Sequence, residues 1–534
     1  MIRASLIFIL LTVAMTWPQA AQLSTHAWDH FDVYFNLWRL RWIAHALASS
    51  PTHLFDGNIF YPESGALTLS DALLVEGLLG APLFWVGLPP VLVHNLLLLA
   101  GIVGSALGMF MLARHLTGSY GAGLLAGAIF AFVPYRFDHY MHMELQWAMW
   151  IPWTFWALDR ALETGAPRYG ALTGLFVGLQ MLSSIYYGIF LSLLLVLVAT
   201  LLLVTKRGRD LRRASASVAI GAAIAAFICA LYAIPYLSTH EKVGNRSELD
   251  IATFSARPSS YLFGTPENWL YRDKFEGRGM PERRLFPGIT AAVLALAGLL
   301  LRSPNATSLV YLLAMIAAFE LSLGIRGYSY MFLHAHVPIL GGLRAPARFG
   351  IFVVFFLGAL AAFGYAAIES SVRPQARRII GAIAVTVALV EYWVAPLPLI
   401  EYPNKPPLLY QWLAQQPPGV VVELPMPIPN QLTGADAEIA YMSTFHWKPV
   451  VNGYSGYFPR SYLQRLDRMR DFPEDPRGFR QFAHDGVRYV IVHPDLYQKD
   501  RGTRVLEALA VRPELIQLGV FDSGRGKAFV FRRR

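Results

Sequence analysis

Long apolar segments recur along the chain, and this repetition limits the possible fold more than any other feature. A membrane-spanning helix needs about 20 mostly apolar residues. The segments that we expect to span are 3–20, 91–113, 119–135, 145–162, 168–184, 187–205, 214–235, 287–302, 306–324, 347–369 and 377–396. Backbone polar groups inside a bilayer must bond within the chain, so such segments fold as helices. The sequence predicts an α-helical polytopic membrane protein with about eleven spans.

Composition excludes the main alternatives. Of the 534 residues, 55% are hydrophobic and 15% are charged, whereas soluble proteins carry roughly 25% charged residues. Disordered chains are poor in apolar and aromatic residues, so disorder is excluded. The single cysteine, Cys229, excludes a disulfide framework and structural cysteine-based metal centres.

The net charge of +10 does not indicate nucleic-acid binding. Lys and Arg lie mostly in short loops between apolar segments, and basic loops of this kind mark the cytoplasmic side of a membrane protein. The basic residues that we place there are Arg114, Arg160, Arg168, Lys206, Arg207, Arg209, Arg212, Arg213, Arg302, Arg373, Arg377 and Arg378. We therefore expect an integral protein of the inner or plasma membrane, with the N-terminus inside and the C-terminus outside.

Two segments leave a choice open. The segment 3–20 is either an uncleaved first span, which we prefer, or a cleaved signal peptide. The run 71–89 is short and is broken by Pro82 and by Pro89-Pro90, so we expect it to be re-entrant or interfacial. If 71–89 were a twelfth span, the basic loops would no longer fall on one side.

This topology predicts two domains. Residues 1–398 form the membrane domain, and its outer loops are 21–70, 136–144, 236–285 and 325–346. After a proline-rich linker, residues 405–534 form a small extracytoplasmic α/β domain. Its predicted strands are 420–424, 488–493, 515–521 and 528–531, and its predicted helices are 435–444, 460–470, 476–484 and 503–511.

The first outer loop contains the acidic candidates for chemistry. A helix predicted over 30–48 places Asp29, Asp32, Asn36 and Arg39 on one polar stripe. An apolar stripe, formed by Phe31, Phe35, Trp38 and Trp42, lies beside it and predicts an interfacial helix with its aromatic rings toward lipid or the core. Alternatively, Asp29 is the N-cap of this helix and Asp32 occupies its third position.

The second outer loop is dense in ionisable residues, among them Arg136, His142 and Glu144. Such groups at membrane depth are costly unless they are paired or wetted, so they indicate a polar cavity that could bind substrate. Mutual salt bridges are the alternative. The spacing of His139, His142 and Glu144 does not match a helical metal-ligand pair, and no metal or other cofactor is predicted.

Two arginines lie where the fourth outer loop enters a span. Arg344 and Arg348 offer guanidinium forks that suit a phosphate or pyrophosphate. The start of the following helix also favours an anion. The alternative is contact with lipid headgroups.

The tail contains His446 within an aromatic and polar stretch, 441–457. Aromatic faces with short polar groups can hold sugars, although loops also pack in this way. The sequence has no P-loop, dinucleotide glycine motif, nucleophile elbow or His-Glu-x-x-His motif, which argues against ATP-driven transport and serine hydrolysis.

These features together resemble the glycosyltransferase C (GT-C) superfamily of integral membrane glycosyltransferases, nearest to the protein-mannosyltransferase-like and bacterial YfhO-like proteins. The layout resembles theirs over most of the chain. The residues that carry the resemblance are Trp28-Asp29-His30-Phe31-Asp32, Phe55 through Pro62, Leu343 through Phe349, and His446 through Tyr457. The Trp-Trp-Asp signature of oligosaccharyltransferases is absent, so peptide Asn glycosylation is not expected.

The resemblance implies transfer of a sugar from a polyprenyl-phosphate carrier to a hydroxyl of a glycan, lipid or protein at the outer face, with inversion. Asp29 is the first candidate for the general base and Asp32 the second. Arg344 and Arg348 are the candidates for holding the leaving phosphate. Arg136, His142, Glu144, Asn36, Arg39 and His446 are further candidate substrate-binding residues.

Two other functions stay open. A lipid or polysaccharide transporter would use acids inside the spans, for which Glu320 and Glu391 are the candidates. A non-catalytic envelope scaffold would tolerate the loss of both Asp29 and Asp32.

Overall fold

The computed structural model describes residues 1–205, 210–301, 304–428 and 435–534. The predicted cytoplasmic residues Lys206, Arg207, Arg209 and Arg302 lie outside these ranges. The chain forms two compact units. The first unit contains residues 1–23, 95–233 and 244–399, and the second contains 24–94, 234–243 and 400–534.

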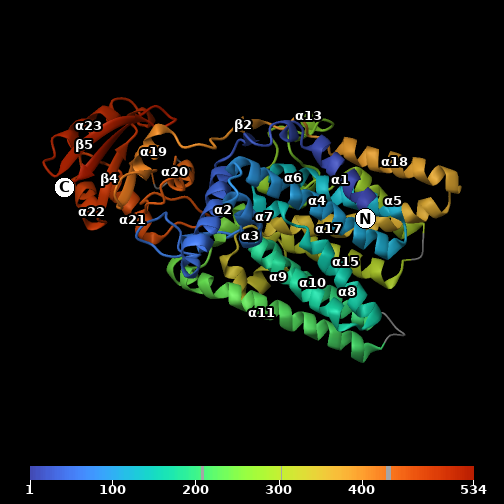
Figure 1. The fold of residues 1–534 in the computed structure, drawn as a ribbon. Coiled ribbons are helices and arrows are strands. Elements are labelled where there is room, and N and C mark those ends of the chain that lie inside the picture. The colour runs from blue at the N-terminus through green and yellow to red at the C-terminus, as the bar shows by residue number, and fades with distance from the viewer. Residues whose placement is uncertain (206–209, 302–303, 429–434) are drawn as a thin grey trace. The chain divides into compact units, whose positions relative to one another are not determined.

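Helices account for the regular structure of the first unit (Figure 1). They are α1 (Ile2–Met15), α4 (Pro90–Thr117, whose first residues belong to the second unit), α5 (Tyr120–Phe132), α6 (Pro134–Asp138), α7 (Met143–Gln146), α8 (Trp150–Thr164), α9 (Pro167–Ser183), α10 (Ile185–Thr205), α11 (Leu211–Val243, which ends in the second unit), α12 (Glu248–Thr253), α13 (Arg272–Phe275), α14 (Ile289–Leu300), α15 (Ala306–Ser322), α16 (Ser329–His336), α17 (Gly350–Ser370) and α18 (Pro374–Glu391).

A helix occupies each of the eleven segments that were predicted to span the membrane. Among the described residues, five helical segments are long and apolar enough to cross by length and composition: Pro90–Thr117, Tyr120–Asp138, Ile185–Thr205, Leu211–Val243 and Pro346–Ser370. Shorter apolar helices include α1, α14 and α15. The predicted class, an α-helical integral membrane protein with a small C-terminal sheet domain, is confirmed.

The first unit packs around α17, whose residues are almost all buried. This helix contacts α5, α14 and α15. Glycines allow the helix backbones to approach closely: a Cβ atom added to Gly364 of α17 would lie 1.8 Å from the carbonyl oxygen of Leu294 in α14. Helices α9 and α11 make a similar contact at Gly170 and Ser217. Small residues at such crossings are typical of membrane helices.

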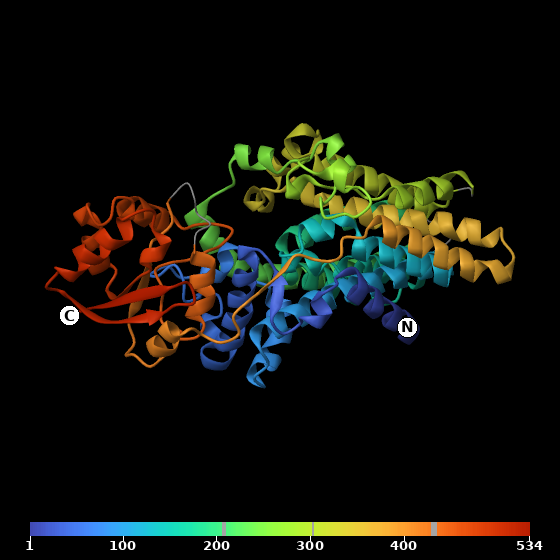
Figure 2. The same ribbon diagram turned by 90° about the horizontal axis from the view of Figure 1, so that it is seen from above.

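The second unit combines helices with a four-stranded sheet, drawn in orange and red in Figure 2. Its elements are β1 (His26–Trp28), α2 (Phe31–Ser49), α3 (Leu74–Trp85), β2 (Leu399–Glu401, at the boundary), α19 (Leu408–Ala414), β3 (Val420–Leu424), α20 (Asp436–Ser443), α21 (Arg460–Met469), α22 (Pro476–His484), β4 (Val487–Val492), α23 (Arg501–Ala510), β5 (Leu515–Asp522) and β6 (Lys527–Arg533). Every strand and helix predicted in the tail is present, and α19 is additional.

The strand order in the sheet is β3-β4-β6-β5. Strand β3 runs parallel to β4, with Val422 opposite Val490, and the other pairs are antiparallel. Residues of β3 and β4 pack with residues of α22 and α23 in an apolar core that includes Val492, Val505 and Phe482.

A segment of the first loop is bonded to the tail. The backbone N–H of Tyr61 donates to Val450 O at 2.9 Å, and Val450 N–H donates to Asn58 O at 2.8 Å. Val450 in turn bridges to Val421 of β3. The first loop and the tail therefore fold as one unit. The run 71–89 contains only the 12-residue helix α3, about 18 Å long, which is too short for a full span.

Candidate active site

The start of α2 places the two acidic candidates. His30, not Asp29, is the N-cap, because its side chain accepts a hydrogen bond from Asp32 N–H. The predicted cap at Asp29 is therefore wrong, and Asp32 is the second helical residue rather than the third. Asp29 is exposed, and its carboxylate makes no hydrogen bond or ion pair with another residue that the structure describes.

Asp32 has a fixed environment. The Tyr454 hydroxyl donates a 2.8 Å hydrogen bond to Asp32 Oδ1, and His30 Nδ1 lies 3.4 Å from Oδ2. The Asp32 side chain is 17% exposed, so it combines orientation with access from solvent. Tyr454 belongs to the aromatic stretch that the sequence singled out, but only the fold brings it to the first loop.

The other two polar residues of the stripe are buried in the second unit. Arg39 donates through Nη1 to the carbonyl oxygen of Asp71 at 2.5 Å and through Nη2 to Asn36. Asn36 Nδ2 lies 3.5 Å from His94 Nε2. Their burial shows that this part of α2 has no solvent-exposed polar face, and Arg39 links α2 to the segment that precedes α3.

The aromatic stripe of α2 faces the protein core rather than lipid. Phe35 and Trp38 are buried and their rings stack at 5.6 Å, and the Trp38 indole N–H donates to Asn58 at 3.0 Å. Asn58 donates in turn to Ser443 of α20. Only Phe31 is largely exposed, at 43%. Of the two predicted surroundings, lipid or the core, the structure places Phe35 and Trp38 in the core, under the tail.

In the first unit, Arg136 stabilises the corner that joins α6 and α7. Its guanidinium donates to Phe130 O at 2.9 Å and to Gln146 O at 3.1 Å, and the Gln146 side chain donates back to Arg136 O. Arg136 is only 2% exposed. This environment assigns Arg136 a structural contact, and its predicted contact with substrate stays untested.

Among the remaining ionisable groups of this loop, Asp138 pairs with a residue outside the loop and two histidines contact each other. Asp138 forms a 2.9 Å ion pair with Arg284 of the long outer loop. His142 Nδ1 lies 3.2 Å from His139 Nδ1. Glu144 is buried in α7.

Arg344 and Arg348 differ in their partners. Arg348 Nε donates to Glu282 Oε1 at 2.6 Å and Nη2 donates to Oε2 at 3.4 Å. Both side chains are nearly buried, at 10% and 12% exposure. Burial acts to raise the pKa of Glu282, but the Arg348 charge outweighs it and holds this pKa well below its ordinary value. Arg348 is thus already neutralised.

The Arg344 side chain is half-buried, and its guanidinium lies 5.0 Å from the centroid of the Phe254 ring. Among the described residues, no acidic side chain forms an ion pair with it. The backbone N–H of Arg344 donates to Tyr186 OH at 2.9 Å, so the segment is fixed while the charge is free to meet an anion.

Further cations of the first unit lie close together. Burial lowers the pKa of Arg326, and the neighbouring charges of Arg257 and Arg283 lower it further. Arg326 is held by bonds to Ala252 O and Ser255 O, each of 3.1 Å. Cations that repel one another at short range favour an anionic ligand.

His446 is buried in the second unit. Its Nδ1 accepts a hydrogen bond from Lys448 N–H at 3.0 Å, and its ring stacks with Tyr410 at 6.2 Å. Burial lowers the pKa of His446 to about 3, with a smaller effect from Lys448, so the ring is neutral at pH 7. At 8% exposure, His446 supports the loop, and its predicted sugar contact stays untested.

Comparison with solved structures identifies the fold. No protein-family profile and no curated protein sequence matches the chain. The structure of the mycobacterial arabinofuranosyltransferase AftD superposes with a TM-score of 0.65 over 99% of this chain and 39% of that one, at 16% identity. The chain has the GT-C glycosyltransferase fold. It spans about two fifths of the AftD chain.

A second GT-C structure, the apo oligosaccharyltransferase from Archaeoglobus fulgidus, superposes with a TM-score of 0.50. The match covers 93% of this chain and 70% of that one, at 13% identity.

Within this GT-C fold, the two acids that the transporter alternative singled out stabilise helix ends. Glu391 accepts hydrogen bonds from Ile289 N–H at 2.5 Å and Thr290 N–H at 2.9 Å, at the start of α14. Glu320 accepts from Ser329 N–H at 2.8 Å, at the start of α16. Carboxylates at helix N-termini satisfy free N–H groups and the helix dipole. Their positions explain both acids without a transport path.

Proposed function

We propose that the protein is a membrane glycosyltransferase that moves a sugar from a polyprenyl-phosphate carrier to an acceptor hydroxyl at the outer face, with inversion. The observation that carries the proposal is the pair of carboxylates at the start of α2: Asp29 is exposed and has no ion-pair partner among the described residues, and Asp32 is oriented by Tyr454. This pair belongs to a chain with the GT-C fold.

The chemistry needs one general base. Asp29 or Asp32 takes the proton of the acceptor hydroxyl while the hydroxyl oxygen forms a bond to the anomeric carbon of the sugar. The bond from that carbon to the phosphate oxygen breaks, and polyprenyl phosphate leaves with the electron pair. Asp29 is the more accessible of the two carboxylates and is our first candidate. The carboxylate of Asp32 has the better-defined orientation, because Tyr454 donates a hydrogen bond to it.

The leaving phosphate needs a cation. Arg344 is the candidate for this role because its guanidinium has no acidic partner among the described residues, and a free fork binds phosphate well. Arg348 is assigned a positioning role, because its charge is compensated by Glu282.

The proposal is tested in cells whose only copy of the protein carries Asp29→Asn or Asp32→Asn. We expect one variant to reach the membrane at the wild-type level, to lose an envelope glycan and to accumulate a polyprenyl-linked sugar. Asp56→Asn is the matched control, because Asp56 is a first-loop carboxylate that pairs with His53 at 2.7 Å. Wild-type glycans and lipid-linked sugars in both Asp29→Asn and Asp32→Asn cells would favour a transporter or a scaffold instead.

A further inference from the structure

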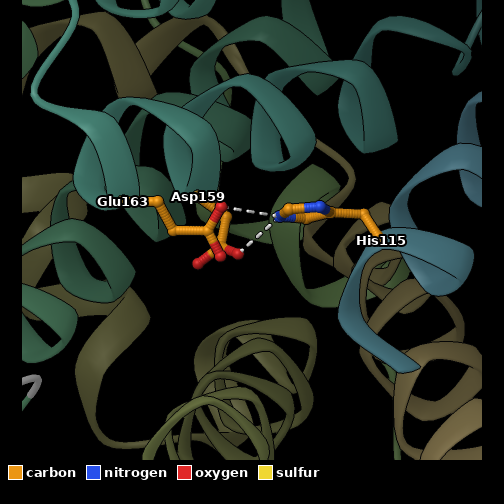
Figure 3. A group of neighbouring side chains, drawn as sticks. All are labelled: His115, Asp159 and Glu163. Carbon is orange, nitrogen blue, oxygen red and sulfur yellow. Dashed lines mark hydrogen bonds and ion pairs between the residues drawn. The ribbon is translucent and has the colours of Figure 1, made fainter. Parts of the chain in front are cut away.

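Three side chains converge where α4 and α8 end (Figure 3). His115 of α4 points toward Asp159 and Glu163 of α8. Its Nε2 atom lies 3.0 Å from Asp159 Oδ2 and 3.4 Å from Glu163 Oε2. One nitrogen and two carboxylate oxygens thus lie within 4.8 Å of one another.

Close helix packing fixes these side chains. Gly101, Gly104 and Gly108 of α4 leave no room for a Cβ atom, which at Gly104 would lie 2.3 Å from Met149 Sδ and at Gly108 2.8 Å from Pro152. His115 follows Gly108 by seven residues, and Asp159 follows Pro152 by seven. Seven residues are nearly two helical turns, so both side chains continue the contact between the helices.

Two carboxylates face the one imidazole. A single Nε2–H can make one good hydrogen bond, yet two carboxylates face it. Arg160 Nη1 lies 3.2 Å from Glu163 Oε2, and the Asp159 side chain is 4% exposed. A divalent cation would neutralise both carboxylates at once.

The donor set indicates the class of cation. Imidazole together with carboxylates suits Zn²⁺ or Mn²⁺, whereas Mg²⁺ prefers oxygen ligands and keeps its waters. With bonds of about 2.1 Å, neighbouring donors around such an ion lie about 3.0 to 3.4 Å apart. Two of the separations seen here, 3.0 and 3.4 Å, agree with that geometry.

We propose that His115, Asp159 and Glu163 bind one divalent transition-metal ion, of the Zn²⁺ or Mn²⁺ type, that fastens α4 to α8. The three ligands belong to the first unit, whereas the candidate bases Asp29 and Asp32 belong to the second. The ion therefore has a structural role on the side that the basic loops predict to be cytoplasmic.

The test uses the full chain, purified in detergent, stripped with EDTA and titrated with Zn²⁺ by calorimetry and with Mn²⁺ by electron paramagnetic resonance. We expect saturable binding of one ion per chain, no competition from excess Mg²⁺, and a rise in melting temperature with Zn²⁺. His115→Ala and Glu163→Gln each weaken binding by at least tenfold and abolish the rise.

His53→Ala is the matched control, because His53 forms a similar pair with Asp56 at 2.7 Å and is 68% exposed. Glu163 is 32% exposed, so its substitution by Gln tests binding without disturbing the core. Equal binding by the wild type and His115→Ala, or loss of binding only in His53→Ala, would overturn the proposal. So would a wild-type protein that binds no ion.

Discussion

The hydroxyl group of Tyr454 donates a 2.8 Å hydrogen bond to Asp32, a residue 422 positions earlier in the chain. The Tyr454 ring also packs edge-on against Phe35, one helical turn after Asp32. Both contacts lie within the second unit, where the first loop and the tail fold together. Through Tyr454, the tail fixes the orientation of the Asp32 carboxylate, which is a candidate general base.

Replacing Tyr454 by Phe removes this hydrogen bond and keeps the ring. A hydrogen bond to a charged group contributes about 1.5 to 3 kcal/mol, so we expect glycosyl transfer to fall roughly tenfold if Asp32 is the base. The acid limb of the pH–rate profile should also move to higher pH, since a carboxylate without a donor holds its proton more tightly. An unchanged profile would assign the base to Asp29.

Substitution of Arg344 and of Arg348 should have different effects. Arg344→Gln removes a charge without an acidic partner among the described residues, so we expect weaker donor binding, seen as a higher KM, with an unchanged melting temperature. A lower melting temperature together with a normal KM would contradict this assignment.

Arg348→Gln leaves Glu282 buried and unpaired. Breaking a buried ion pair costs about 3 to 5 kcal/mol, so we expect a marked loss of thermal stability. The double variant Arg348→Gln/Glu282→Gln should recover much of that stability. Equal melting temperatures for the single variant and the wild type would show that the pair does not form.

The contact between α14 and α17 predicts a difference between two glycines of one helix. A Cβ atom at Gly364 would lie 1.8 Å from a backbone oxygen, whereas at Gly358 it would lie 3.3 Å from the flexible end of Met109. Overpacking typically costs about 1 to 3 kcal/mol. We expect Gly364→Ala to lower the melting temperature in detergent and Gly358→Ala to leave it unchanged or raised. The opposite order would contradict this helix contact.

The buried His446 predicts a pH dependence of stability in the second unit. Burial lowers the folded-state pKa to about 3 from the ordinary 6.5, so the stabilising contribution is complete above pH 6.5 and is lost as the pH falls toward 3. Between pH 6.5 and 4.5 the loss amounts to about 2 to 3 kcal/mol. His446→Asn keeps an acceptor near Lys448 N–H but does not titrate.

Thermal unfolding at pH 7 and pH 4.5 should therefore show a smaller decrease for His446→Asn than for the wild type. Equal decreases would mean that His446 titrates normally in the folded protein.

Local patterns were sufficient to predict the membrane helices and the elements of the tail. The run Val420–Leu424 begins with three β-branched valines and is bounded by glycine and proline, and it forms β3 as expected. The helix after Asp29 was also predicted, but its cap was not. Asp is a much commoner N-cap than His, and only the fold shows that His30 takes this place.

Contacts between distant residues could not be predicted from one sequence. Asn58 donates to Ser443, 385 residues away, and Arg348 binds Glu282, 66 residues away. No local periodicity encodes either contact, so the burial of α2 under the tail and the neutralisation of Arg348 were missed. The spacing of Asp159 and Glu163, one helical turn apart, was visible in the sequence, but the approach of His115 was not.

The most direct test measures release of polyprenyl phosphate by the full chain in lipid nanodiscs, supplied with labelled polyprenyl-linked sugars and envelope acceptor from its host. Removing a general base costs roughly a hundredfold or more in rate. We predict release by the wild type and by Asp56→Asn, and a loss of this size in Asp29→Asn or Asp32→Asn. Release at the wild-type rate by both of these variants would contradict the assignment of the base to the first loop.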